Sequence, residues 1–285
     1  MIKENVLRVG LGEIGRSLFE IITKTNRFVV FGLDLDKEKM IAINQNQNKF
    51  PSKMDVMHVC IPCKSQKNFL EVVLQYAKQY NPQLVIINST VLPGTTRKLY
   101  EQYQYLVVHS PVRGVHKDLT HMIWEMKRWT KYIGGINSNA SKFASAHFNK
   151  IGLKVKKLKS CTESELAKLF ETTYRAWMIA CFQEMHRISK SFSGTYDDIV
   201  DFLEDTHRVR LDRPIMFPDF IGGHCLIPNT KLLLESYDSE FLKLILKSNE
   251  KRNCEIKDKS VRREIKQINK RAKNLQKELM ELTKR

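Results

Sequence analysis

The sequence predicts an α/β protein in which a parallel sheet domain is followed by an all-helical region and a helical tail. Short β-rich runs alternate with helical segments up to about residue 158, and this alternation implies a parallel sheet covered on both faces. The apolar spacing of residues 162–189 is that of one long helix. Beyond Pro228 there is neither Gly nor Pro, so the end of the chain is also predicted to be helical.

The elements follow one another in a regular order. The expected strands are VLRVG, FVVFGLD, VMHVCIP, QLVIINST, YLVVHSPV, KYIGGI and GLKVKKL. Thr162 is predicted to begin the long helix, because Glu165 stands three residues later and can complete a capping box. We therefore expect three regions: a sheet domain at 1–158, a helical central domain at 159–250, and a basic helical tail at 251–285.

A glycine cluster follows the first strand. VGLGEIG has G-x-G-x-x-G spacing and opens a helix, and an acidic residue, Asp34, stands at the end of the next strand. This context indicates a Rossmann-type domain whose turn and helix N-terminus receive a pyrophosphate. Asp34 would accept the ribose hydroxyls and repel a 2′-phosphate, which favours NAD over NADP. The alternative is a glycine turn without a ligand. The predicted cofactor residues of this cluster are Gly10, Gly12, Glu13, Ile14, Gly15 and Asp34.

A second short motif, FPDFIGGHCLIPNT, places a cysteine directly after two glycines and a histidine. Gly222 and Gly223 allow backbone to approach a ligand closely. Cys225 can then act as a thiolate nucleophile. The alternative is a small buried hydrophobic residue, as most free cysteines are.

Four stretches together resemble the UDP-glucose/GDP-mannose dehydrogenase family: GLGEIG, INSTVLPGTT, SELAKLFETTYRAWMIACFQEM and IGGHCLIP. Their order and approximate spacing match the family over roughly residues 5–250. The resemblance implies NAD-dependent oxidation of a sugar primary alcohol to a carboxylate in two hydride transfers, through a thiohemiacetal and a thioester on cysteine. It also implies a short divergent member, because the family's third, nucleotide-binding domain has no counterpart after about residue 250.

The resemblance assigns roles to individual residues. Cys225 matches the family nucleophile, and Lys168 matches a lysine that can stabilise the developing oxyanion. An ordinary exposed helix lysine is the alternative for Lys168. Pro62 and Thr90 match positions beside the cofactor at the ends of two strands.

The sequence departs from the family at the groups that activate water. Thr172 stands where the family has Asn, Asn229 where it has an acid, and Val112 where it has a glutamate. Asn229 can form hydrogen bonds but cannot act as a base, so these positions lack the groups that would activate water to hydrolyse the thioester. His116 lies nearby in sequence and could substitute as an acid–base group; a surface loop histidine is the alternative.

Three arginines precede the cysteine motif in HRVRLDRP. Related enzymes use arginine in this region to reach substrate, and arginine suits a phosphate or carboxylate clamp. The predicted substrate-binding residues are Arg208, Arg210, Arg213, Gly222 and Gly223.

The basic tail has a heptad pattern. The formal net charge is +17, and residues 250–285 hold thirteen lysines and arginines against six acidic residues. The spacing of its apolar residues predicts a coiled-coil seam that would support a homodimer. The alternative is one amphipathic helix packed on its own domain. The seam residues are Val261, Ile265, Ile268, Ala272, Leu275, Leu279 and Leu282.

Other features place limits on the function. No apolar run reaches the ~18 residues of a membrane span, there is no signal-peptide pattern, and six cysteines form no disulfide framework. We therefore expect a cytoplasmic protein without membrane attachment. Cys60 and Cys63 have C-x-x-C spacing, but two packed thiols are favoured over a metal site. Nucleic acid is an unlikely partner, although the basic tail leaves it open.

The leading hypothesis is an NAD-dependent dehydrogenase that oxidises a primary alcohol or aldehyde of a sugar derivative. One alternative is a catalytically impaired NAD-binding protein whose tail recruits a partner. An intermediate alternative is a two-electron dehydrogenase that keeps hydride transfer but no longer hydrolyses a thioester.

Overall fold

A computed structural model describes residues 3–44, 50–114 and 118–282 of the chain. The residues group into two compact units, Met1–Lys168 and Leu169–Arg285, which are described separately below. The long helix α7 (Cys161–Ser191) runs through the division.

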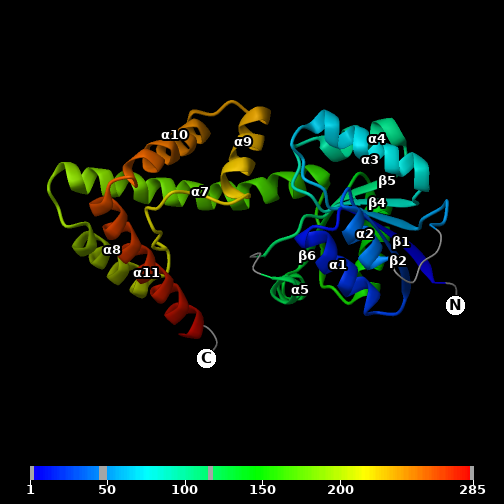
Figure 1. Cartoon of the computed structure of the whole chain (residues 1–285), viewed down its shortest axis with the longest axis horizontal. Helices are drawn as coiled ribbons and strands as arrows, with labels where there is room; N and C mark the ends of the chain where they lie inside the picture. The colour runs from blue at the N-terminus through cyan, green and yellow to red at the C-terminus, as the bar shows by residue number, and fades with distance from the viewer. Residues whose placement is uncertain (1–2, 45–49, 115–117, 283–285) are drawn as a thin grey trace. The chain divides into compact units, whose positions relative to one another are not determined.

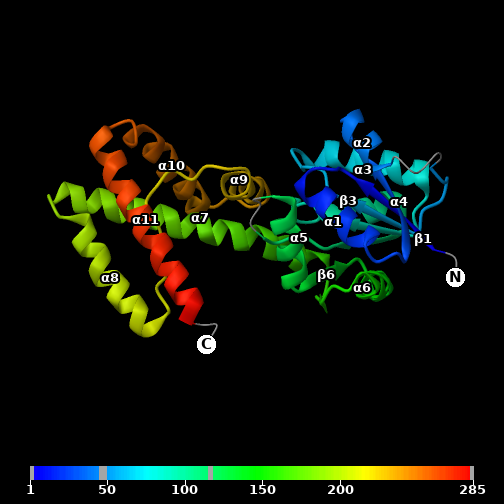
Figure 2. The ribbon, with the colours of Figure 1, turned by 60° about the horizontal axis from the view of Figure 1, so that its bottom comes forward.

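The first unit is built on one seven-stranded sheet (Figures 1 and 2). The strand order is β2-β1-β3-β4-β5-β6-β7, and every neighbouring pair is parallel except β5 with β6. The predicted α/β class, a mostly parallel Rossmann-like sheet followed by helices, is confirmed. The strands are β1 (Glu4–Val9), β2 (Phe28–Leu33), β3 (Val56–Val59), β4 (Leu84–Ile87), β5 (Leu106–His109), β6 (Lys131–Gly135) and β7 (Val155–Lys157).

Helices cover both faces of the sheet. On one face α3 (Gln66–Tyr80) and α4 (Thr95–Tyr103) bury Val73 and Leu99 against strand residues such as Val85. On the other face α1 (Glu13–Thr23), α5 (Leu119–Arg128) and α6 (Ser138–Ile151) pack over residues such as Ile86 (Figures 1 and 2). The short α2 (Lys37–Ile43) follows β2. Burial on both faces explains why these strands have nearly continuous apolar sequences.

The start of α7 differs from the predicted capping box. The helix begins at Cys161, and the Ser160 hydroxyl accepts a hydrogen bond from the Thr162 N–H at 3.2 Å. The Ser160 hydroxyl also lies 2.5 Å from the Glu163 carboxylate. The predicted Thr162–Glu165 pair is therefore wrong by two residues, because Glu165 turns instead toward the loop after β4.

The second unit contains most of α7 and four further helices: α8 (Tyr196–Arg210), α9 (Leu226–Ser236), α10 (Glu240–Glu255) and α11 (Lys259–Leu282). Tyr196 and Val200 of α8 pack with Ile268 of α11, and each of these side chains is at most 1% exposed. This small core joins the C-terminal helix to its own unit.

The predicted coiled-coil tail is corrected by this packing. Ile265, Ile268, Ala272 and Leu275 are all at most 6% exposed, because the seam of α11 packs inside the second unit. Ion pairs also hold α11 against α8 of its own unit, since Arg271 contacts the carboxylates of Asp197, Asp201 and Glu204. The buried part of the seam is therefore not available to pair with a second chain, and the alternative of one packed amphipathic helix describes it.

No helix in the described parts of the chain has the length and apolar character needed to cross a bilayer.

Candidate functional site

The glycine turn after β1 is held by close backbone contacts. The Gly10 N–H donates to Leu33 O at 2.8 Å, so the turn is joined to the end of β2. Gly10 has a φ of +91°, and an added Cβ would lie 2.7 Å from Cys60 O. A Cβ at Gly15 would lie 1.8 Å from Gly10 O. Only glycine can therefore occupy positions 10 and 15 without displacing backbone.

Gly12 differs from its two neighbours. It precedes α1 in an extended conformation, and an added Cβ would meet no atom within 4 Å. It lines a cavity of ≈ 330 Å³ together with residues that include Glu13, Arg16, Lys39 and Asp118. The open side of Gly12, the N-terminus of α1 and two basic side chains fit a pyrophosphate. Glu13 is exposed and Ile14 is half-buried in the same turn.

Asp34 lies where the fingerprint predicts it, directly after β2. Its Oδ2 accepts a hydrogen bond from the Leu11 N–H at 2.6 Å, and its Oδ1 accepts one from the Asp36 N–H at 3.0 Å. The carboxylate is thus fixed beside the glycine turn and is only half-buried. This arrangement fits a group that receives ribose hydroxyls.

The loop after β4, which contains Thr90, is anchored by Glu165 of α7. Its carboxylate accepts hydrogen bonds from Gly94 N–H at 2.7 Å, from Thr96 N–H at 2.8 Å and from the Thr96 hydroxyl at 2.6 Å. Burial raises the pKa of Glu165 above its usual value, although these three donors oppose the shift. Sequence reasoning missed this role, because the only signal was a glutamate that also matched a capping box.

A buried polar cluster lies beneath the turn. The Arg8 side chain is fully buried and donates from Nη2 to Cys60 Sγ at 2.9 Å. The Lys131 ammonium donates to Asn88 Oδ1 at 3.2 Å and to Ser110 O at 2.5 Å. Burial lowers the pKa of Lys131 to about 7. These contacts tie the carboxyl ends of β3, β4 and β5 together where cofactors bind in such sheets.

The two cysteines with C-x-x-C spacing are separated by this arrangement. Cys60 belongs to the polar cluster, while the buried Cys63 belongs to the apolar core under α3. Pro62 between them is exposed at the carboxyl end of β3. Across the described ranges, no group of three or more His, Cys, Asp and Glu side chains is placed to hold a metal ion.

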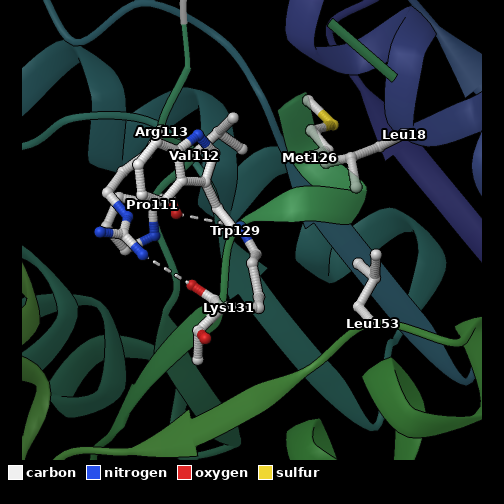
Figure 3. Close-up of a pocket in the computed structure, with 9 residues that line it drawn as sticks. Leu18, Pro111, Val112, Arg113, Met126, Trp129, Lys131 and Leu153 are labelled. Atoms are coloured by element: carbon white, nitrogen blue, oxygen red, sulfur yellow. Dashed lines mark hydrogen bonds between the residues drawn. The ribbon is translucent and has the colours of Figure 1, made fainter. Parts of the chain in front are cut away.

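Val112, predicted to stand where the resembled family has a glutamate, lies beside a small cavity of ≈ 20 Å³ (Figure 3). Its side chain is 6% exposed and packs in the core. In the same view Lys131 donates to Pro111 O at 3.1 Å and Arg113 donates to Thr130 O at 3.0 Å. Among the residues that the structure describes, no carboxylate lines this cavity. His116, considered as a substitute, lies outside the described residues.

Lys168 is half-buried on α7, in the first unit. Burial lowers the pKa of His109 at the end of β5 to about 3, and the charges of Lys131 and Lys168 add to this effect. His109 is also held by Ser164, whose hydroxyl lies 2.8 Å from Nδ1. Lys168 therefore contributes positive charge near the carboxyl end of β5.

The cysteine motif lies in the second unit, with Cys225 as the residue that precedes α9. Cys225 is half-buried, and Gly223 before it has a φ of +80°, which favours glycine. The N-terminus of a helix stabilises a negatively charged sulfur. The geometry therefore suits a thiolate at Cys225. Gly222, earlier in the motif, is exposed.

The structure brings Thr172 and Asn229 together. Asn229 lies one helical turn after Cys225, and its N–H donates to Cys225 O at 2.9 Å. Its side-chain Nδ2 donates to Thr172 Oγ1 at 3.2 Å, and both side chains are buried. Neither can accept a proton from water at neutral pH.

The three predicted substrate arginines differ in their surroundings. Arg208 donates to Glu204 on α8 and to Glu278 on α11, so it joins these two helices. Arg213 pairs with its neighbour Asp212 at 2.9 Å. Arg210 is exposed. All three arginines are exposed, but Arg208 forms ion pairs with Glu204 and Glu278 that join two helices of the same unit.

Comparisons with known proteins agree with this arrangement. The family described as "UDP-glucose/GDP-mannose dehydrogenase family, central domain" matches residues 162–253. The UDP-N-acetyl-D-mannosamine dehydrogenase of Methanocaldococcus jannaschii is 25% identical, over 87% of this chain and 65% of that protein. The UDP-glucose 6-dehydrogenase of Campylobacter jejuni is 24% identical, over 86% of this chain and 72% of that protein. The chain thus spans less than two thirds of the length of the first relative.

Solved structures share the fold. The UDP-D-ManNAc dehydrogenase of Pyrococcus horikoshii has a TM-score of 0.70 at 19% identity, over 86% of this chain and 68% of that chain. The 3-hydroxyisobutyrate dehydrogenase of Mycobacterium tuberculosis has a TM-score of 0.64 at 14% identity, over 90% of this chain and 95% of that chain.

The chain combines a Rossmann-like sheet with a helical unit, and several of the proteins it resembles are dehydrogenases of nucleotide sugars. The match to the central-domain family covers the predicted residues Lys168, Thr172, Cys225 and Asn229. Over residues 162–253 the chain is similar to the central domain of the UDP-glucose/GDP-mannose dehydrogenase family.

Proposed function

We propose that the protein is an NAD-dependent dehydrogenase that oxidises the primary alcohol or aldehyde of a sugar derivative, with Cys225 as the covalent nucleophile. The observation that carries this proposal is the position of Cys225 at the N-terminal end of α9, after a glycine with positive φ. The Thr172–Asn229 hydrogen bond one helical turn further on supports it, because both residues occupy family site positions.

The glycine turn of the first unit is proposed to hold NAD. Gly12 and the N-terminus of α1 would receive the pyrophosphate, and Asp34 would accept the adenosine ribose hydroxyls. Pro62 and Thr90 would border the other half of the cofactor, since both follow strands of the same sheet edge. When bound there, NAD supplies a hydride acceptor. Lys168 would stabilise negative charge on the substrate oxygen.

Cys225 is proposed to form a thiohemiacetal by attack of its sulfur on the aldehyde carbon, with the proton going to the aldehyde oxygen. Loss of a hydride from that carbon, to the acceptor that bound NAD would supply, together with loss of the hydroxyl proton to solvent, would leave a thioester on Cys225. Its hydrolysis requires a base that activates water. The buried Asn229, Thr172 and Val112 provide none, so we expect hydrolysis to be the slow step.

This chemistry is tested with Cys225→Ser. The variant should lose turnover and keep NAD affinity, because the cofactor residues lie in the other unit. Incubation of the unaltered protein with an aldehyde substrate and NAD should give an acyl adduct on the Cys225 peptide by mass spectrometry. Turnover that survives in the serine variant would exclude the covalent role. Turnover that depends on Cys225, with no adduct at any time, would exclude slow hydrolysis.

The cofactor site is tested with Gly12→Ala and Asp34→Asn. Alanine at position 12 meets no neighbour within 4 Å, so it should preserve the fold while its methyl group obstructs the pyrophosphate. Asparagine at position 34 keeps an oxygen for the Leu11 N–H but removes the charge that repels a 2′-phosphate. Calorimetry should show weaker NAD binding for the first variant and a narrowed NAD/NADP preference for the second. NADP bound as tightly as NAD by the unaltered protein would refute the assignment.

The substrate is proposed from the relatives, whose names specify UDP-N-acetyl-D-mannosamine and UDP-glucose. The exposed Arg210 and Arg213 are the candidates to bind a phosphate group. NADH formation from a panel of sugar nucleotides and sugar phosphates tests this proposal. Activity with sugar phosphates alone would indicate a smaller substrate than those of the relatives.

Self-association through α7 is a further part of the proposal. Phe170, Tyr174 and Ile188 are 54%, 62% and 52% exposed, and their spacing of four and fourteen residues places them on one helix face. An exposed apolar stripe of this kind is typical of an interface. Light scattering on Tyr174→Glu should show a lower mass than the unaltered protein. An unchanged mass would exclude this face from the interface.

A further inference from the structure

The second unit forms a partly open cavity that the proposed reaction does not use. Its volume is ≈ 370 Å³, within the range of small-ligand pockets. It lies between α7, α8, the segment before the cysteine motif and α11. The apolar part of its wall comes from Leu211, Ile215, Met216, Phe217, Ala272, Leu275, Leu279 and Met280.

A buried polar atom in this wall has no hydrogen-bond partner among the residues that the structure describes. His207 lines the cavity, is 8% exposed, and its Nδ1 forms no hydrogen bond in the structure. A buried ring nitrogen without a partner costs free energy, and such groups are rarely left unsatisfied. The atom therefore indicates a ligand with a polar group at this point.

The remaining polar residues of the wall indicate the sign of the charge on the ligand's polar group. Arg175 and Lys273 also line the cavity, and among the described residues neither forms an ion pair. The acidic neighbours are already committed: Glu204 pairs with Arg208 and Arg271, and Glu278 pairs with Arg208. Within the described part of the chain, the cavity therefore offers two cations that form no ion pair, and no carboxylate belongs to its lining.

We propose that this cavity binds a small organic anion with an apolar body. The body lies against Phe217, Leu275 and their apolar neighbours. The anionic group accepts a hydrogen bond from His207 Nδ1–H and is attracted by Arg175 and Lys273. The described residues that line the cavity include neither Cys225 nor the glycines of the turn, and the proposal does not depend on the proposed oxidation.

The test uses 8-anilinonaphthalene-1-sulfonate, an aromatic sulfonate whose fluorescence rises in apolar surroundings. We expect saturable binding with one site per chain. Arg175→Ala, Lys273→Ala and His207→Phe should each weaken the affinity roughly 3- to 10-fold. Lys266→Ala is the matched control, because Lys266 is an exposed lysine of α11 outside the cavity, and it should leave the affinity unchanged.

A second probe separates charge from apolar contact. N-phenyl-1-naphthylamine has the same rings without the sulfonate, and its weaker binding should not respond to Lys273→Ala. Equal losses for both probes would overturn the anion assignment. Binding that is unsaturable, or unchanged in all three cavity variants, would overturn the site itself. Displacement of the sulfonate by UDP would show that the cavity belongs to the substrate site, and would likewise overturn a separate site.

Discussion

Glu165 offers a sharp test of how the structure prepares the cofactor loop. Its side chain is fully buried and accepts three hydrogen bonds from Gly94 and Thr96, in the loop that begins near Thr90. We consider two replacements. Glu165→Ala removes all three acceptors, whereas Glu165→Gln keeps Oε1 for the two donors of Thr96 and presents an amide N–H₂ group to the Gly94 N–H.

The expected cost follows from these contacts. A hydrogen bond to a charged group contributes about 1.5–3 kcal/mol, and a buried donor left without an acceptor costs about 1–3 kcal/mol. Removal of the carboxylate also removes its desolvation cost, which is the main cause of its raised pKa. We therefore expect Glu165→Ala to lower the free energy of unfolding by about 3 kcal/mol, and Glu165→Gln by about 1–2 kcal/mol.

Urea denaturation followed by circular dichroism measures both values, and calorimetry with NAD measures the effect on the loop. Glu163→Ala is the matched control, since it removes the same charge from the same helical turn but at an exposed position. It should cost no more than about 1 kcal/mol. If Glu165→Ala costs no more than Glu163→Ala, the loop does not depend on Glu165 and the reasoning is refuted.

Three further predictions concern the sheet, the turn and the last helix. Burial lowers the pKa of Lys131 from 10.5 to about 7. Between these two pH values the unfolded chain therefore binds more protons than the folded chain, so the free energy of unfolding should rise with pH. Lys131→Met should reduce the slope of the free energy of unfolding against pH by up to about 1.4 kcal/mol per pH unit, as measured by denaturation between pH 7.5 and 9.5. Gly15→Ala should destabilise the protein by about 3 kcal/mol or prevent folding, because its Cβ would lie 1.8 Å from Gly10 O; a melting temperature equal to that of the unaltered protein would contradict this packing. Ile268→Ala should cost about 2–4 kcal/mol independently of protein concentration, whereas Met280→Ala, at 49% exposed, should cost little; a concentration-dependent loss for Ile268→Ala would indicate an intermolecular seam instead.

Some of the architecture is determined by the sequence alone. The alternation of strands and helices is local, and the three glycines of the turn act through contacts that their spacing already implies. Asp34 was predictable for the same reason, because the end of the second strand must lie beside the first turn in a parallel sheet. The fold class and the geometry of the glycine turn were therefore within reach of the sequence.

The polar cluster under the turn could not be predicted from the sequence. Arg8 and Lys131 are 123 positions apart, and nothing near either residue in sequence indicates that both are buried beside Cys60. Glu165 presents the same difficulty, since its partners lie 69 to 71 residues away. Contacts of this range depend on how helices are placed on the sheet, and periodicity carries no information about that placement.

The α11 seam shows the limit most clearly. A heptad of apolar residues states that one helix face will be buried, but the period is the same whether the partner is a second chain or a helix of the same unit. Ile268 meets Tyr196 and Val200 of its own chain, and Arg271 meets the acidic face of α8. The sequence determined that this face of α11 is buried. The tertiary structure determined which surface covers it, because only the folded chain brings α8 within reach of α11.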